Sequence, residues 1–196
     1  MNPAADTKPF KLAVLSDGEW QEHSHGAFFS IETTSGGAMR LVTGALSGSD
    51  EPFRCLTDVL KPPFFALYIL HTSRGEGDEG RYQSPEISKD ELHGFLDRFS
   101  EYLSGDARFD LWVYSPDDKS TVVWDRHNYL YAYGPMEKFS STLSAHGFTE
   151  GAVGQLGEHM HHYREEFDAD ARAMLGWFDW ILTPLKPGDE QFHDRP

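Results

Sequence analysis

Residues 109–133, FDLWVYSPDDKSTVVWDRHNYLYAY, decide the fold class of this chain. Three runs rich in β-branched and aromatic residues, 109–114, 121–124 and 129–133, alternate with two polar stretches that contain Pro, Asp and Asn. These polar residues are typical of tight turns, so the pattern predicts three consecutive antiparallel strands. Such a meander argues against the regular strand–helix–strand order of a Rossmann-like fold.

More strands are predicted before the meander. Residues 27–34 and 39–43 form a predicted hairpin, because Ser35-Gly36-Gly37 tolerates the positive φ of a tight turn. Residues 64–72, FFALYILHT, are apolar on both faces and predict a central strand that is covered from both sides, or nearly so. A further strand is predicted at 10–15, and loops at 16–26 and 73–84.

The clearest helix signal lies at residues 88–105. Ser88 and Glu91 form a predicted capping box, and Gly105 is expected to end the helix in the left-handed conformation. Between them, an apolar stripe at helical spacing consists of Leu92, Phe95, Leu96, Phe99 and Leu103.

Three other helices are predicted by their start and stop residues. One begins at Asp50 with Pro52 in its first turn and ends before Pro62-Pro63, and another extends from Pro135 to Gly147. The last helix is expected to be capped by Asp168 or Asp170 and to end before Pro184. Its predicted stripe consists of Ala171, Met174, Leu175, Phe178 and Leu182.

These elements predict an α+β fold, with a largely antiparallel sheet of about six to seven strands packed against three to four helices. The length of 196 residues suits one globular domain over 1–196. A loose N-terminal tail is expected over 1–9 and a polar C-terminal tail over 187–196.

The charge and cysteine content restrict the environment and the partners. The 32 acidic and 17 basic residues give a net charge of −15, which repels nucleic acids and anionic membranes. Cys55 is the single cysteine, no secretion signal is evident at the N-terminus, and no apolar run approaches the roughly 20 residues of a membrane helix. Together these features predict a cytoplasmic protein.

Ten histidines are the strongest chemical signal. Five of them fall in two short clusters, and these are the candidate metal ligands: His23, His25, His159, His161 and His162. In an extended segment, the His-x-His spacing places two imidazoles on one face, where they can chelate a transition metal. The alternative is that they are polar loop residues, since the context of a known metal motif is missing.

A second candidate is Asp125-Arg126-His127, which could do acid–base chemistry at the end of the sheet. Asp and Asn are also what a hairpin turn requires, so a structural turn is the favoured interpretation. No catalytic residue is assigned, and no cofactor is expected unless the histidines bind a metal.

The aromatic residues suggest an interaction surface or a homo-oligomer interface. Its candidate residues are Trp124, Tyr129, Tyr131, Tyr133, Trp177 and Trp180. The alternative places the tyrosines in the core beneath a helix.

Three functions remain open. The first is a non-enzymatic interaction module that neutralises or regulates a basic protein partner; immunity proteins that block bacterial toxins have this general character, although no motif is shared with them. The second is a metal-dependent hydrolase that uses the histidine clusters, and the third is a small-molecule binder with a pocket of Tyr and Trp residues.

Overall fold

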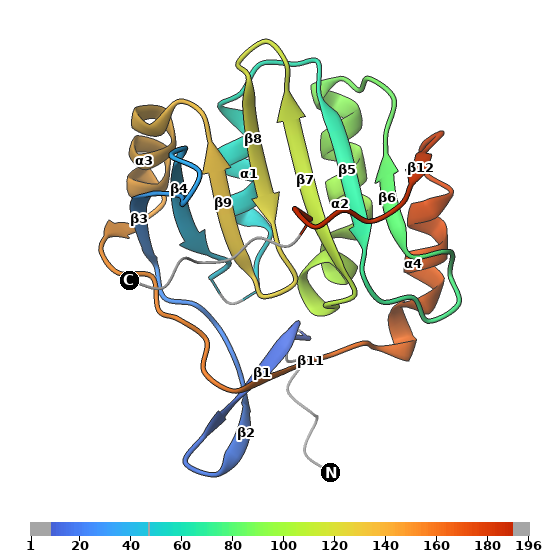
Figure 1. The fold of residues 1–196 in the computed structure, drawn as a ribbon, viewed down its shortest axis with the longest axis horizontal. Helices are drawn as coiled ribbons and strands as arrows, with labels where there is room; N and C mark the ends of the chain where they lie inside the picture. Colours follow the sequence, from blue (N-terminus) through green and yellow to red (C-terminus); the bar gives the residue numbers. More distant parts are fainter. Residues whose placement is uncertain (1–8, 47, 190–196) are drawn as a thin grey trace.

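The computed structural model describes residues 9–46 and 48–189. Its main feature is a nine-stranded sheet with the order β10-β3-β4-β9-β8-β7-β5-β6-β12, in which β10 and β3 are parallel and the other pairs antiparallel (Figure 1). The predicted meander lies at its centre as β7 (Phe109–Ser115), β8 (Ser120–Trp124) and β9 (Tyr129–Tyr133). The other strands are β3 (Phe28–Thr33), β4 (Met39–Gly44), β5 (Phe65–Leu70), β6 (Gly80–Gln83), β10 (Thr149–Glu150) and β12 (Ile181–Thr183). The α+β class is confirmed, with more strands than predicted.

Helices cover one face of this sheet (Figure 1). They are α1 (Glu51–Asp58), α2 (Lys89–Gly105) and α3 (Met136–Ala145), with α4 (Asp168–Leu175) beside α2, and a short 3₁₀ turn at Glu165–Phe167 precedes α4. Phe53 of α1 packs on Trp124 of β8, with ring centroids 5.7 Å apart, and both side chains are fully buried. Burial of one such phenylalanine contributes roughly 1.5–3 kcal/mol.

The predicted capping box of α2 is present, but its end differs from the prediction. The Ser88 hydroxyl accepts from the Glu91 amide at 3.2 Å, and the Glu91 carboxylate accepts from the Ser88 amide at 2.7 Å. Gly105 is the last helical residue and does not adopt a positive φ. Its lack of a side chain is needed for packing, because a Cβ there would lie 2.7 Å from Pro9 and 2.8 Å from Phe167.

A three-stranded sheet with the order β11-β1-β2 lies beside one end of the large sheet (Figure 1). It consists of β1 (Leu12–Ser16), β2 (Glu19–Glu22) and β11 (His159–His161). The prediction of a loop over 16–26 is therefore wrong for β2. Asp17 and Gly18, with φ of 52° and 83°, make the two-residue turn that returns the chain as a hairpin.

The C-terminal region corrects two more predictions. The last helix is capped by Phe167 and ends at Leu175, so neither Asp168 nor Asp170 is its cap. Residues 181–183, predicted as helix, form β12 and pair with β6, which itself lies in the predicted loop 73–84. Backbone pairing between these distant segments decides both strands, and a local pattern does not report it.

The helix-free face of the large sheet is covered only in part. Near β4, β8 and β9 it forms a second apolar cluster beneath Val153 and Leu156. Further along lies a groove of about 400 Å³, lined by Phe65, Leu67, Gln83, Trp112, Tyr114 and Thr121. The predicted cover on both faces of 64–72 is therefore wrong at Phe65 and Leu67, which are half-buried in this groove.

Parts of both predicted tails lie outside the described residues, namely 1–8 and 190–196. Within the described part, Asp189 is buried and pairs with Arg81 of β6. None of the helices in the described ranges has the length and apolarity that crossing a membrane requires.

Candidate metal centre

The turn between β8 and β9 presents His127. The Asp125 carboxylate folds this turn by accepting from the backbone amides of His127 and Tyr129, at 2.9 and 2.8 Å. Its second oxygen lies 3.1 Å from His127 Nδ1. A carboxylate at this nitrogen favours the tautomer with the proton on Nδ1, and Nε2 then offers its lone pair.

Strand β11 presents the next two imidazoles. In the register of the small sheet, His159 is opposite Val14 and His161 is opposite Leu12, so the alternation of a strand places both histidines on one face. His159 Nδ1 lies 2.9 Å from the carbonyl oxygen of Gly157, to which it can donate. The Nε2 atom of His159 is then left as the ligand atom, as in His127.

His127, His159 and His161 converge at the junction of the two sheets. Each offers one ring nitrogen, and these three atoms lie within 4.8 Å of one another, with all three side chains half-buried. The ring centroids are 5.2 Å apart for His127 and His159, 4.8 Å for His127 and His161, and 5.3 Å for His159 and His161. Tetrahedral zinc with Zn–N bonds of 2.0–2.1 Å needs nitrogens about 3.3 Å apart, so small side-chain rotations would complete the site.

The electrostatics keep the third imidazole neutral. Burial, followed by the neighbouring His127 and Arg126, lowers the pKa of His161 to about 3. His161 Nε2 is buried and has no hydrogen-bond partner in the part of the chain that the structure describes. A buried ring nitrogen without a partner is costly, and a metal ion would satisfy it.

The other predicted ligands lie around the triad and outside it. His25 is buried, and its Nε2 lies 3.0 Å from the carbonyl oxygen of His127, so it supports the turn. His23 contacts His25 edge-on, with centroids 4.7 Å apart. Burial, followed by the proximity of His159, lowers the pKa of His23. His162 does not belong to the triad, and its pKa is lowered by burial and by Arg164.

The structure thus brings together His159 and His161 of the predicted ligands and adds His127, for which a structural turn was the favoured interpretation. The turn is real, since Asp125 accepts from two of its amides, and the same carboxylate orients His127 as a ligand. A carboxylate two residues before a histidine was the available signal. Sequence spacing could not show that residues 127 and 159 meet.

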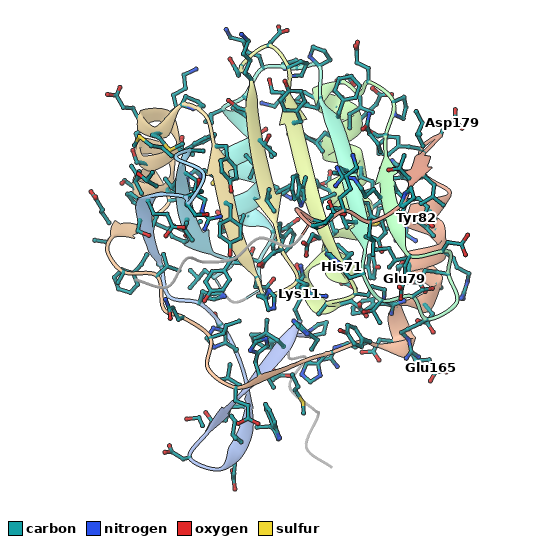
Figure 2. All side chains as sticks on the ribbon, viewed as in Figure 1. Lys11, His71, Glu79, Tyr82, Glu165 and Asp179 are labelled. Carbon is teal, nitrogen blue, oxygen red and sulfur yellow. The ribbon has the colours of Figure 1, made fainter. Side chains whose placement is uncertain are left out.

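A buried lysine lies close to this centre. Lys11 is fully buried, and its Nζ donates to the carbonyl oxygen of Asp125 at 3.2 Å and lies 4.3 Å from the centroid of the Trp124 ring. Burial lowers its pKa to about 8, against the opposing effect of nearby carboxylates. Figure 2 shows Lys11 near His71 at the end of the sheet that faces the small sheet. A positive charge on Lys11 would favour an anion beside the three histidines.

The predicted aromatic surface is mostly interior. Trp124, Tyr129 and Tyr131 are buried, and Tyr129 donates to the carbonyl oxygen of Gly154 at 2.7 Å. The two tyrosines lie beneath the segment of Val153 and Leu156, and no helix within residues 9–46 and 48–189 covers them. Tyr133 is half-buried beside Arg40, Trp180 packs on Phe95, and Trp177 is 43% exposed.

Comparison of the chain with protein-family models, with curated proteins and with solved structures finds no match. The case for a function therefore depends on the geometry and chemistry of the site.

Proposed function

We propose that this protein binds a divalent transition-metal ion, with zinc the best fit, and that the ion holds and activates a water molecule for hydrolysis. The proposal is supported by one observation above all. Three imidazoles from two distant segments converge, with one ring nitrogen of each within 4.8 Å of the others. Two of these imidazoles have an acceptor at Nδ1.

Zinc is favoured by the donor set. Imidazole nitrogen is a preferred ligand of zinc, and acceptors at the second ring nitrogen are the usual supporting contacts of metal-bound histidines. Structural zinc sites normally use four protein ligands, whereas catalytic sites use three and leave one position for water. Three histidines therefore favour a catalytic centre, in which zinc lowers the pKa of its bound water to about 7.

Zinc binding is tested by competition with a fluorescent chelator, using protein purified without an affinity tag. The expected result is one zinc per chain, with an affinity that falls at least about 100-fold in His127→Gln, His159→Gln and His161→Gln. His146→Gln is the matched control, because His146 is an exposed histidine at the end of α3. Equal affinity of His127→Gln and the wild type would contradict the proposed ligand set.

The open position is tested without knowledge of the substrate. Cobalt(II) replaces zinc, and its visible spectrum reports the ligands of the ion. Addition of azide is expected to change the spectrum, because azide replaces the bound water. A spectrum that azide leaves unchanged, together with stoichiometric cobalt, would mean that a protein group fills the fourth position and that the site is structural.

A further inference from the structure

A second surface is independent of the metal centre and lies on the hairpin of β1 and β2. This hairpin projects from the body of the molecule (Figure 1). β2 is the outermost strand of the small sheet, and all four of its side chains are exposed. Among the described residues, no strand pairs with the outer side of β2.

The exposed side chains of the hairpin have a distinct chemistry. The register pairs Leu15 with Trp20 and Ala13 with Met160, and strand alternation places these residues on the face opposite His159 and His161. Leu15, Trp20 and Met160 are 38%, 45% and 40% exposed. Large apolar side chains that gather on a projecting element, instead of being scattered singly, are typical of interaction sites.

The hairpin itself carries only negative charge around this apolar face. Residues 12–22 contain Asp17, Glu19 and Glu22 and no Lys or Arg, and Glu158 is exposed at the start of β11. Arg164 of the body of the molecule lies 3.9 Å from Glu22. With the net charge of −15, this rim attracts a basic segment and repels a second copy of the same hairpin.

The backbone of β2 supplies the remaining feature. The amide of His23 donates to the carbonyl oxygen of Leu12 in β1, at 3.1 Å. Amides alternate in direction along a strand, so those of Glu22 and Trp20 point away from β1. The outer edge thus offers unpaired donors and acceptors to an added strand, beside an apolar residue and between carboxylates.

We propose that the outer edge of β2, with Trp20 as its apolar anchor, docks an extended basic segment of a protein partner as an added strand. The lysines or arginines of that segment lie beside Glu19 on one face of the added strand, and its alternate apolar side chains contact Trp20 on the other face. This proposal does not depend on the metal centre.

The probe is a capped peptide of alternating lysine and valine, Lys-Val-Lys-Val-Lys-Val, measured by calorimetry in the presence of a chelator. The same peptide methylated at every backbone amide carries the same charge but cannot donate to a strand. The unmodified peptide is expected to bind at least about tenfold more tightly, because strand addition requires those donors. Trp20→Ala and Glu19→Lys are each expected to lose about tenfold, while Trp177→Ala, a change of another exposed tryptophan, keeps the affinity.

Each other outcome overturns the proposal. Equal binding of both peptides would mean simple attraction between charges, and absence of binding would remove the site altogether. Sedimentation that shows a dimer in the wild type and a monomer in Trp20→Ala would assign the edge to a second copy of the chain. Zinc binding is measured separately, so failure here leaves the metal centre untouched.

Discussion

Two polar clusters lie where the large sheet meets the small one, and they differ in whether their buried polar groups all have partners. The first is centred on Arg108, which is fully buried. Its guanidinium donates to both carboxylate oxygens of Asp106, at 2.8 and 2.9 Å, and also to Glu76, Asp168 and the carbonyl oxygen of Arg164. Every charge in that network has an opposite charge beside it, so the network has a structural role and needs no bound ligand.

In the histidine cluster, by contrast, one buried polar group lacks a partner. His161 Nε2 is buried without a partner in the described part of the chain, and one ring nitrogen from each of His127, His159 and His161 lies within 4.8 Å of the other two. Buried polar groups are normally satisfied, so an unsatisfied set that converges indicates a missing ligand. Burial alone therefore does not identify a site; at the triad, a buried nitrogen without a partner coincides with the convergence of three ring nitrogens.

The largest effect is expected from Arg108→Met, which breaks the complete network. Asp106 and Glu76 would then remain buried without their counter-ion, and such a change costs about 3–5 kcal/mol. Urea unfolding should show this loss. The zinc affinity of the folded fraction should stay the same, because Arg108 does not contact the triad. A variant of unchanged stability would contradict the structural role of the network.

Addition of zinc to the histidine cluster is expected to have the next largest effect on stability. Zinc at 100 times its dissociation constant should stabilise the chain by about 2.7 kcal/mol, since the unfolded chain lacks the site. For a protein of this length that corresponds to a rise of about 5–10 °C in Tm, measured by calorimetry. His159→Gln should abolish the rise, and a rise that persists in this variant would place the ion elsewhere.

Asp125→Asn tests the support of one ligand. The asparagine can keep the amide contacts of the turn through its oxygen, while its NH₂ group faces His127 Nδ1 and favours the proton on Nε2, the wrong tautomer for binding. Zinc affinity should fall about 10–100-fold, with unfolding by urea nearly unchanged. Equal affinity would show that Asp125 serves the turn alone.

The last prediction concerns the pH dependence of stability without metal. The pKa of His161 in the folded protein is about 3, below its ordinary value of 6.5, so the unfolded state binds more protons between these values. The contribution of His161 is therefore present above pH 6.5 and is lost as pH falls toward 3. The free energy of unfolding, measured with denaturant between pH 7 and 4, should decrease less steeply in His161→Gln than in the wild type. Parallel pH dependences of the two proteins would contradict the shifted pKa.

Local patterns predicted most of the fold. The meander, the hairpin of β3 and β4 and the start of α2 depend on neighbouring residues, such as Ser88 with Glu91, and they were predicted correctly. β2, β6, β10, β11 and β12 were missed. The Asp17-Gly18 turn was a signal for β2, but the pairing of β12 with β6 joins segments about 100 residues apart and leaves no local trace.

The site was predicted only in part, because its residues come from two segments that are distant in the sequence. His159-x-His161 is a local pattern, and strand β11 places both imidazoles on one face as expected. His127 comes from a turn 32 residues earlier, and its role depends on how the small sheet packs against the large one. Spacing reports which residues share a strand, and tertiary structure decides which strands meet.

The most direct test of the central claim is a crystal structure of the protein with zinc, with anomalous data collected at the zinc edge. We expect one strong peak about 2.0–2.1 Å from a nitrogen of each of His127, His159 and His161, with a water molecule as the fourth ligand. A triad that stays empty while zinc occupies other histidines would contradict it.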